Sequence, residues 1–269
     1  IQKLDAKGNL LWVKQIGGKG AEDGTSMAID NNGNIFLIGH FNGSDSIDFD
    51  PGAGTAKLIS KGYDDIYILK LDSNGNFLWV KQIGGTLQER ARSISMDING
   101  NILIAGNFEA TVDFDPGPNS NNLSVNGAFP KYEDIFILKL DTDGDFLWVK
   151  QIGGPDTEVL YSMTMDVFGN IYTTGSFSGP ADFDPSADTV ILRCLGDSYY
   201  DMFVQKLDTN GNLLWVKHIA GYRTEKGKSI TTDINGYPYI LGDFSSTVDF
   251  NPSMDTFNLT ASAGGDLFI

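Results

Sequence analysis

The strongest constraint on the fold is that the chain repeats one stretch of sequence four times. Each copy reads Leu-Trp-Val-Lys-(Gln/His)-Ile-(Gly/Ala)-Gly, follows a Lys-Leu-Asp triplet and precedes an Asp-Phe-(Asp/Asn)-Pro. Successive copies lie about 67 residues apart, and such a long period is typical of arrays or rings of supersecondary units. The copies begin at Leu11, Leu78, Leu147 and Leu214. We expect one repeat domain over residues 1–269, with repeats at approximately 1–65, 66–134, 135–201 and 202–269.

One repeat reads as a series of short β-strands. In the second copy, residues 65–72, 77–83, 93–97 and 102–108 are rich in β-branched and aromatic residues, which favour strands. Turn sequences separate them, and a longer connection holds one or two weaker strands. Apolar residues occupy both faces of the strand at 65–72. A sheet buried on both faces is what a propeller blade requires.

An Asp-x-x-Gly motif occurs twice in every repeat and predicts hairpin turns. Asp caps its own backbone in a type I turn, and Gly takes the left-handed position that closes the hairpin. The stretch 141–145 resembles an Asp-rich calcium loop, but an EF-hand needs about twelve residues and a distant Glu. We interpret all eight motifs as turns. They begin at Asp5, Asp30, Asp72, Asp97, Asp141, Asp166, Asp208 and Asp233.

These patterns predict an all-β propeller with one blade of four to five strands per repeat. The chain closes with Asp266-Leu-Phe-Ile269 and opens with Ile1-Gln-Lys-Leu-Asp5, which reads as the continuation of the same strand. We therefore expect the N-terminal strands to complete the C-terminal blade, removing exposed sheet edges. The alternative is that the four repeats form part of a larger seven- or eight-bladed ring or an open array.

Composition excludes several classes of protein. The chain has 35 acidic and 19 basic residues, a formal charge of −16, which argues against binding to nucleic acid or anionic membranes. No apolar stretch approaches the roughly 18 residues of a membrane helix. The one cysteine, Cys194, is interpreted as a packed residue, and His40 and His218 look incidental. The chain begins at Ile1 without Met or a signal sequence, as expected of a processed product or an excised segment.

Residues 65–85 and 93–106, read together and repeated in phase, resemble the SBBP family of bacterial β-propeller repeats. The resemblance covers essentially the whole chain. It implies a propeller within a large secreted or surface-attached bacterial protein, often of the Bacteroidota kind. The resemblance implies no catalytic residues in this chain. Family rings are expected to have about seven blades, whereas this chain has four repeats.

The Asp-Phe-(Asp/Asn)-Pro motif is the best candidate for a metal site. Side chains at i and i+2 of an extended segment point to one side, and two carboxylates with loop carbonyls are ligands that suit Ca²⁺. The alternative is an Asx-capped turn that ends a strand before Pro. The candidate ligands are Asp48, Asp50, Asp113, Asp115, Asp182, Asp184 and Asp249. No other cofactor is predicted.

Two further residue types recur once per repeat. A Glu follows each Gly-Gly or Ala-Gly break, and it is interpreted as an acceptor for backbone amides or a partner of the neighbouring blade. A Trp lies inside one strand of each repeat, where burial between blades is expected and stacking on a sugar is the alternative. These residues are Glu22, Glu89, Glu158 and Glu225, and Trp12, Trp79, Trp148 and Trp215.

Any specific ligand should be bound by polar residues that differ between repeats, which gather in the connections at 119–131, 195–200 and 221–228. Repetition without a unique polar cluster favours a non-catalytic, secreted or cell-surface scaffold or adhesion module that binds protein or matrix. A multivalent carbohydrate-binding propeller is the alternative. A polysaccharide-degrading enzyme would need a repeat-breaking cluster of acids near the axis, and the sequence shows none.

Overall fold

The computed structural model describes residues 1–127, 132–195, 200–253, 255–262 and 264–269. These residues form 25 β-strands in antiparallel sheets. No helix among them has the length and hydropathy needed to cross a membrane. The prediction of an all-β fold is confirmed.

The strands are grouped into blades, each built in the order of the chain. The first blade contains β3 (Ala21–Ile29), β4 (Ile35–Asn42), β7 (Asp65–Leu71) and β8 (Phe77–Ile83). The second contains β9 (Glu89–Met96), β10 (Ile102–Phe108), β13 (Asp134–Leu140) and β14 (Phe146–Ile152). The third contains β15 (Glu158–Met165), β16 (Ile171–Phe177), β19 (Asp201–Leu207) and β20 (Leu213–Gly221).

The fourth blade has three strands: β21 (Glu225–Thr232), β22 (Pro238–Phe244) and β25 (Asp266–Phe268). Every blade carries a short two-stranded hairpin between its second and third strands. These hairpins are the weaker strands predicted in the longer connection of each repeat. These hairpins are β5 (Ile47–Asp48) with β6 (Lys57–Leu58), β11 (Thr111–Asp113) with β12 (Asn122–Ser124), β17 (Pro180–Asp182) with β18 (Ile191–Arg193), and β23 (Thr247–Asp249) with β24 (Asn258–Thr260).

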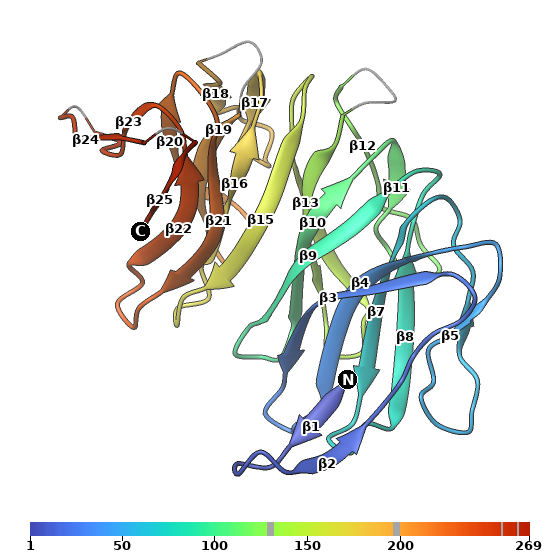
Figure 1. Cartoon of the computed structure of the whole chain (residues 1–269). Coiled ribbons are helices and arrows are strands. Elements are labelled where there is room, and N and C mark those ends of the chain that lie inside the picture. The colour runs from blue at the N-terminus through green and yellow to red at the C-terminus, as the bar shows by residue number, and fades with distance from the viewer. Residues whose placement is uncertain (128–131, 196–199, 254, 263) are drawn as a thin grey trace.

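The blades form an open arc. The first strands of neighbouring blades, β3, β9, β15 and β21, pack in sequence along it, and the two chain ends lie at opposite ends of the arc (Figure 1). Each of the first three blades takes two strands from one sequence repeat and two from the next, because the repeat unit as read from the sequence begins at a third strand.

The prediction that the N-terminal strands complete the C-terminal blade is wrong for the described residues. Strand β1 (Gln2–Leu4) pairs with β2 (Leu10–Val13) in a separate hairpin, and β25 pairs with β22 alone. The hairpin packs on the first blade instead: Trp12 joins a cluster with Phe49 and Tyr67. The arrangement therefore corresponds to the alternative, an open array or a segment of a larger ring.

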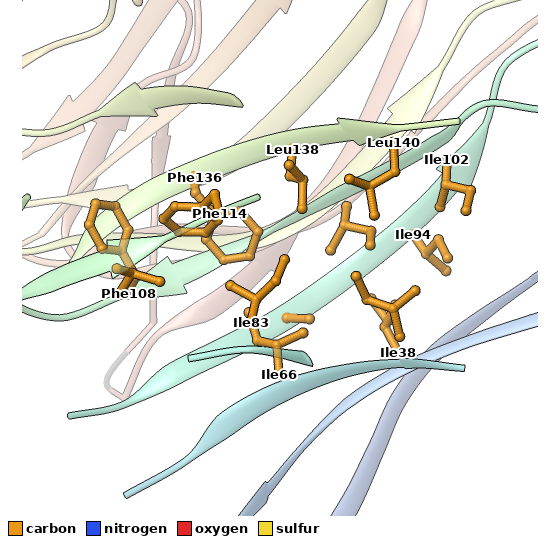
Figure 2. Close-up of a cluster of buried hydrophobic side chains, with 14 of the residues drawn as sticks. Ile38, Ile66, Ile83, Ile94, Ile102, Phe108, Phe114, Phe136, Leu138 and Leu140 are labelled. Atoms are coloured by element: carbon orange, nitrogen blue, oxygen red, sulfur yellow. The ribbon is translucent and has the colours of Figure 1, made fainter. Parts of the chain in front are cut away.

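Apolar side chains fill the space between neighbouring blades. Figure 2 shows Ile38, Ile66 and Ile83 of the first blade facing Phe136 and Leu138 of the second. All five side chains are buried, as expected for sheets covered on both faces. The second and third blades, and the third and fourth, enclose equivalent clusters. Burial of apolar side chains between neighbouring blades thus stabilises each junction in the same way.

The eight Asp-x-x-Gly motifs are turns, as predicted. In the motif at 141–145, Asp141 Oδ1 accepts hydrogen bonds from the amides of Asp143 and Asp145, both at 2.9 Å. The amide of Gly144 donates to the Asp141 carbonyl at 3.1 Å, and the φ angle of Gly144 is 78°. All eight have the same closing bond from Gly to Asp.

Candidate functional site

The Asp-Phe-(Asp/Asn)-Pro motifs lie at the ends of β5, β11, β17 and β23. Asp113 Oδ1 accepts from the amides of Asp115 at 3.1 Å and Asn121 at 2.8 Å, while Phe114 between the two Asp residues is buried. Asp48, Asp182 and Asp249 make the same pair of bonds.

In the three motifs with a second Asp, that side chain also accepts a hydrogen bond from the backbone. Asp50, Asp115 and Asp184 each accept from the amide two residues later, at 2.7, 2.8 and 3.0 Å. Across the described part of the chain, no three His, Cys, Asp or Glu side chains gather as a metal site would require. The geometry is that of an Asx-capped turn, and calcium binding stays a prediction.

The recurrent Glu residues lie inside the blade junctions. Glu89, Glu158 and Glu225 are fully buried, and each accepts a hydrogen bond from the Gly four residues before it, at 2.7, 2.8 and 2.9 Å. Burial raises their pKa values to about 8, 9 and 8. The interpretation as acceptors of backbone amides is confirmed for these three, and they form no open circle of carboxylates.

The recurrent Trp residues contribute to packing between blades. Within their own blades, Trp79 lies edge-on to Phe36 with ring centroids 6.0 Å apart, and Trp215 lies similarly against Tyr172. Trp79 also packs against the cluster shared by the first and second blades, and Trp215 against the one shared by the third and fourth. Trp12 and Trp148 also pack against apolar clusters. The expectation of burial between blades is confirmed in its main point, although all four remain partly accessible.

The polar groups that break the repeat meet in a groove between the first and second blades. The groove encloses a cavity of about 860 Å³. Arg90 on β9 donates from Nε and Nη2 to Asp64 Oδ2, at 3.0 and 2.8 Å, and Asn42 Nδ2 donates to Asp64 Oδ1 at 2.8 Å. His40 and Asp23 line the same cavity, with His40 Nε2 3.8 Å from Asp23 Oδ2. We call Asp23, His40, Asn42, Asp64 and Arg90 the junction groove.

Burial and charge set the protonation of the groove. Burial lowers the pKa of His40, against the opposing effects of the Asp64 and Asp23 charges. Burial disfavours the Asp64 carboxylate, but hydrogen bonds from Asn42 and Arg90 outweigh it and hold its pKa below the ordinary value. The groove at neutral pH therefore contains a neutral imidazole beside an ion pair, a combination that offers both donors and acceptors to a ligand.

Cations and tyrosines extend this polar surface along the first strands of the later blades. Lys228 Nζ lies 4.2 Å from the ring centroid of Tyr161, and Lys226 Nζ lies 5.8 Å from that of Tyr200. Arg92, on the same strand as Arg90, has a buried Nε without a hydrogen-bond partner. We call Arg90, Arg92, Tyr161, Lys226 and Lys228 the inner-strand cations and tyrosine.

Acidic residues accompany these cations. Burial raises the pKa of Glu133, and the charge of Arg92 opposes that rise. Burial likewise raises the pKa of Glu109, with Arg90 opposing. The surface therefore mixes charges, within a chain whose formal charge is −16.

Only part of this surface is predictable from the sequence. His40 looked incidental, yet it lines the junction groove. An alignment of the four repeats carries the signal, because the residue at the position of His40 differs in every blade. The equivalent residues are Asn107, Ser176 and Asp243. Of the predicted variable connections, 221–228 contains Lys226 and Lys228, whereas residues 128–131 and 196–199 of the other two lie outside the described residues.

Comparison with known proteins supports a propeller. Residues 11–45 and 147–179 match a family model described as the SBBP beta-propeller repeat. An uncharacterised WD repeat-containing protein of Acanthamoeba polyphaga mimivirus is 26% identical over 250 residues, which cover 85% of this chain and 18% of that protein. The regulatory protein FlaEY of Caulobacter vibrioides is 23% identical over 214 residues, covering 74% of this chain and 21% of that protein. The chain thus spans about a fifth of the length of these relatives.

Proposed function

Because this chain carries SBBP beta-propeller repeats, we propose that it is a non-catalytic interaction scaffold within a secreted or cell-surface protein. The blades supply a rigid frame, and the junction groove together with the inner-strand cations and tyrosine binds a protein partner. In a repeat protein with a rigid scaffold, a specific ligand is bound by the residues that differ between the repeats. The expected partner is a protein segment that presents carboxylates to these cations.

One observation carries the proposal. Four repeats agree at the residues that build turns and cores, but they disagree at one end of their first strands. There Arg90 and Lys226 occupy the position held by Asp23 and Val159 in the other two blades. A change of charge at one position of a repeated frame is what a specific binding site requires. Arg92, on the same strand as Arg90 and only half-buried, supplies a guanidinium group suited to a carboxylate.

A peptide array tests the proposal. Residues 1–269 are applied to acidic, basic and neutral peptides at low and physiological salt. We expect selective binding to acidic peptides, about tenfold weaker at the higher salt because exposed charges are screened. The double variant Arg92→Gln, Lys228→Gln should abolish this binding. Lys7→Gln serves as control because Lys7 lies in the exposed turn of the N-terminal hairpin.

Carbohydrate binding is the second candidate, and one feature favours it. Tyr63 lines the junction groove with its side chain exposed, and an exposed aromatic face beside amide and carboxylate groups suits a sugar ring. A glycan array run in parallel separates the candidates. Glycan binding that is lost in Tyr63→Ala and kept in the Arg92, Lys228 double variant would replace the protein-partner proposal.

A further inference from the structure

Every blade carries a β-bulge at the same place in its first strand. In the second blade, Ala91 pairs with Gly106 and Ser93 with Ala105, so the residue between them has no residue opposite it on β10. The first strands of the other three blades skip one residue at the equivalent place. A bulge turns one side chain in a new direction, and bulges are frequent beside functional sites. We call the skipped residues the bulge residues: Thr25, Arg92, Tyr161 and Lys228.

The bulge residues point away from the core of their blades. Along β9, the consecutive residues Arg92 and Ser93 are half-buried, whereas the residues of the opposite face are buried, namely Glu89, Ala91 and Ile94. A regular strand alternates between its two faces, so two successive residues on the less buried face mark the effect of the bulge. β15 has the same burial pattern, and β21 likewise leaves both residues at this place accessible. The first strands contact one another along the arc, so the bulge residues lie on its inner surface.

The residue after the bulge is a serine in all four blades. Two of these serines join neighbouring first strands. Ser93 Oγ donates to the Met163 carbonyl at 3.1 Å, and the Ile230 amide donates to Ser162 Oγ at 3.2 Å. These bonds hold the bulges of the second, third and fourth blades side by side. The frame thus repeats at the serine, while the bulge residue before it is different in every blade. The four serines are Ser26, Ser93, Ser162 and Ser229.

Three neighbouring blades present side chains of different chemistry at this level of the arc. The residue two positions before each bulge residue lies on the same side of its strand, and it too is half-buried. An apolar and aromatic pair is therefore flanked by two pairs of cations. Arg90 is already held by Asp64, and Lys228 Nζ lies 4.2 Å from the ring centroid of Tyr161. The pairs are Arg90 with Arg92 in the second blade, Val159 with Tyr161 in the third and Lys226 with Lys228 in the fourth.

Part of this positive charge is not neutralised. Within the described ranges of the chain, neither Arg92 nor Lys226 forms an ion pair. Lys228 Nζ lies 3.8 Å from Asp243 Oδ2, and both side chains are partly exposed. Burial raises the pKa of Glu133 although the Arg92 charge opposes the rise, so this acid compensates Arg92 less than an exposed carboxylate would. In a chain of formal charge −16, these cations are complementary to an acidic ligand.

We propose that the bulge residues of the second, third and fourth blades recognise an acidic protein segment with an apolar residue at its centre. This inference rests on the proposed function, and it specifies the sequence pattern of the partner. Arg92 binds one carboxylate and Lys228 binds a second, while the apolar residue lies between them against Tyr161. Packed sheets lie about 10 Å apart and an extended chain advances about 3.3 Å per residue, so carboxylates about six residues apart reach cations that are two blades apart.

Fluorescence anisotropy with labelled heptapeptides tests this pattern on residues 1–269. The peptide Glu-Gly-Ser-Leu-Ser-Gly-Glu should bind at least about tenfold more tightly than the same peptide with Ser in place of Leu, because burying the leucine is favourable. Moving both Glu residues to one end of the peptide should also weaken binding. Tyr161→Ser should remove the preference for Leu, whereas Tyr161→Phe should keep it. Thr25→Gln is the matched control, because it changes the bulge residue of the first blade, outside the proposed surface.

The outcomes separate this inference from the proposed function. A melting temperature close to that of the wild type shows that each variant is folded. If the Leu and Ser peptides bind the wild type equally, or if Tyr161→Ser leaves the preference for Leu unchanged, recognition of a central apolar residue is wrong. The proposed function survives that result if acidic peptides still bind and lose their binding in the double variant Arg92→Gln, Lys228→Gln. If no acidic peptide binds, both proposals are wrong.

Discussion

Glu158 accepts a hydrogen bond from the amide of Gly154 at 2.8 Å, while its second carboxyl oxygen is buried without a partner. Glu89 and Glu225 have the same arrangement with Gly85 and Gly221. The single hydrogen bond compensates for lost water at only one of the two carboxyl oxygens. The cost of burying the charge is therefore larger than the gain from the hydrogen bond, and the protonated carboxyl group is favoured. Three blade junctions are thus built around a carboxyl group that is best accommodated without charge.

Stability should therefore fall as the pH rises. The pKa of Glu158 is raised from 4.5 to about 9, so between these values the folded state holds a proton that the unfolded state has released. The free energy of unfolding then decreases with pH throughout this window. We expect the melting temperature, measured by circular dichroism, to drop progressively from pH 5 to pH 9, by roughly 2–4 °C for each kcal/mol lost.

Replacing the titrating group isolates its effect. Glu158→Gln keeps the acceptor for the Gly154 amide and cannot ionise, so its melting temperature should vary less with pH than that of the wild type. Glu22→Gln is the matched control, because Glu22 occupies the same place at the open end of the arc and is only half-buried. Equal pH profiles for Glu158→Gln and the wild type would contradict the assignment.

Asn107 should be the costliest polar side chain to remove from a blade junction. It is buried on β10, where its Nδ2 donates to the Glu158 carbonyl at 2.6 Å and its Oδ1 accepts from the Leu160 amide at 3.2 Å. Asn107→Ala leaves two buried backbone groups unpaired, so the free energy of unfolding should fall by about 1–3 kcal/mol. Urea denaturation measures this, and exposed Asn119→Ala is the control.

Gly106 should not tolerate a side chain. A Cβ added there would overlap the Arg90 carbonyl and lie 2.9 Å from both the Ala91 Cα and the Phe136 ring. The irregularity in pairing between β9 and β10 lies at this place, so the backbones cannot separate without opening the blade. We expect Gly106→Ala to cost about 1–3 kcal/mol in urea denaturation. Gly17→Ala should be neutral, because its nearest atom would be 3.5 Å away.

The sequence predicted the features that depend on neighbouring residues. Turn motifs such as Asp141 to Gly144, and strands such as 65–72, rest on local backbone preferences, and the structure confirms them. Closure of the ring could not be predicted in this way. The Lys-Leu-Asp triplet at 3–5 matches both a strand that completes the fourth blade and a hairpin that covers the first.

The junction groove was not predictable because its residues come from distant parts of the chain. Asp64 and Arg90 are separated by 26 residues, and each is unremarkable within its own segment. His40 gains its surroundings from Asp23 opposite it on β3 and from the packing of β4 beside β9, which carries Arg90. A position-by-position comparison of the four repeats would have identified these residues as exceptions, although not their proximity.

Asp113 provides the test that separates a turn from a calcium site. Its Oδ1 holds the amides of Asp115 and Asn121, so Asp113→Ala should lower the free energy of unfolding by about 1–2 kcal/mol. Asp113→Asn keeps the same acceptor and should be close to wild type, with a melting temperature that neither chelator nor Ca²⁺ changes. If chelator lowers the melting temperature of the wild type, Ca²⁺ but not Na⁺ restores it, and Asp113→Asn removes the response, these motifs bind calcium.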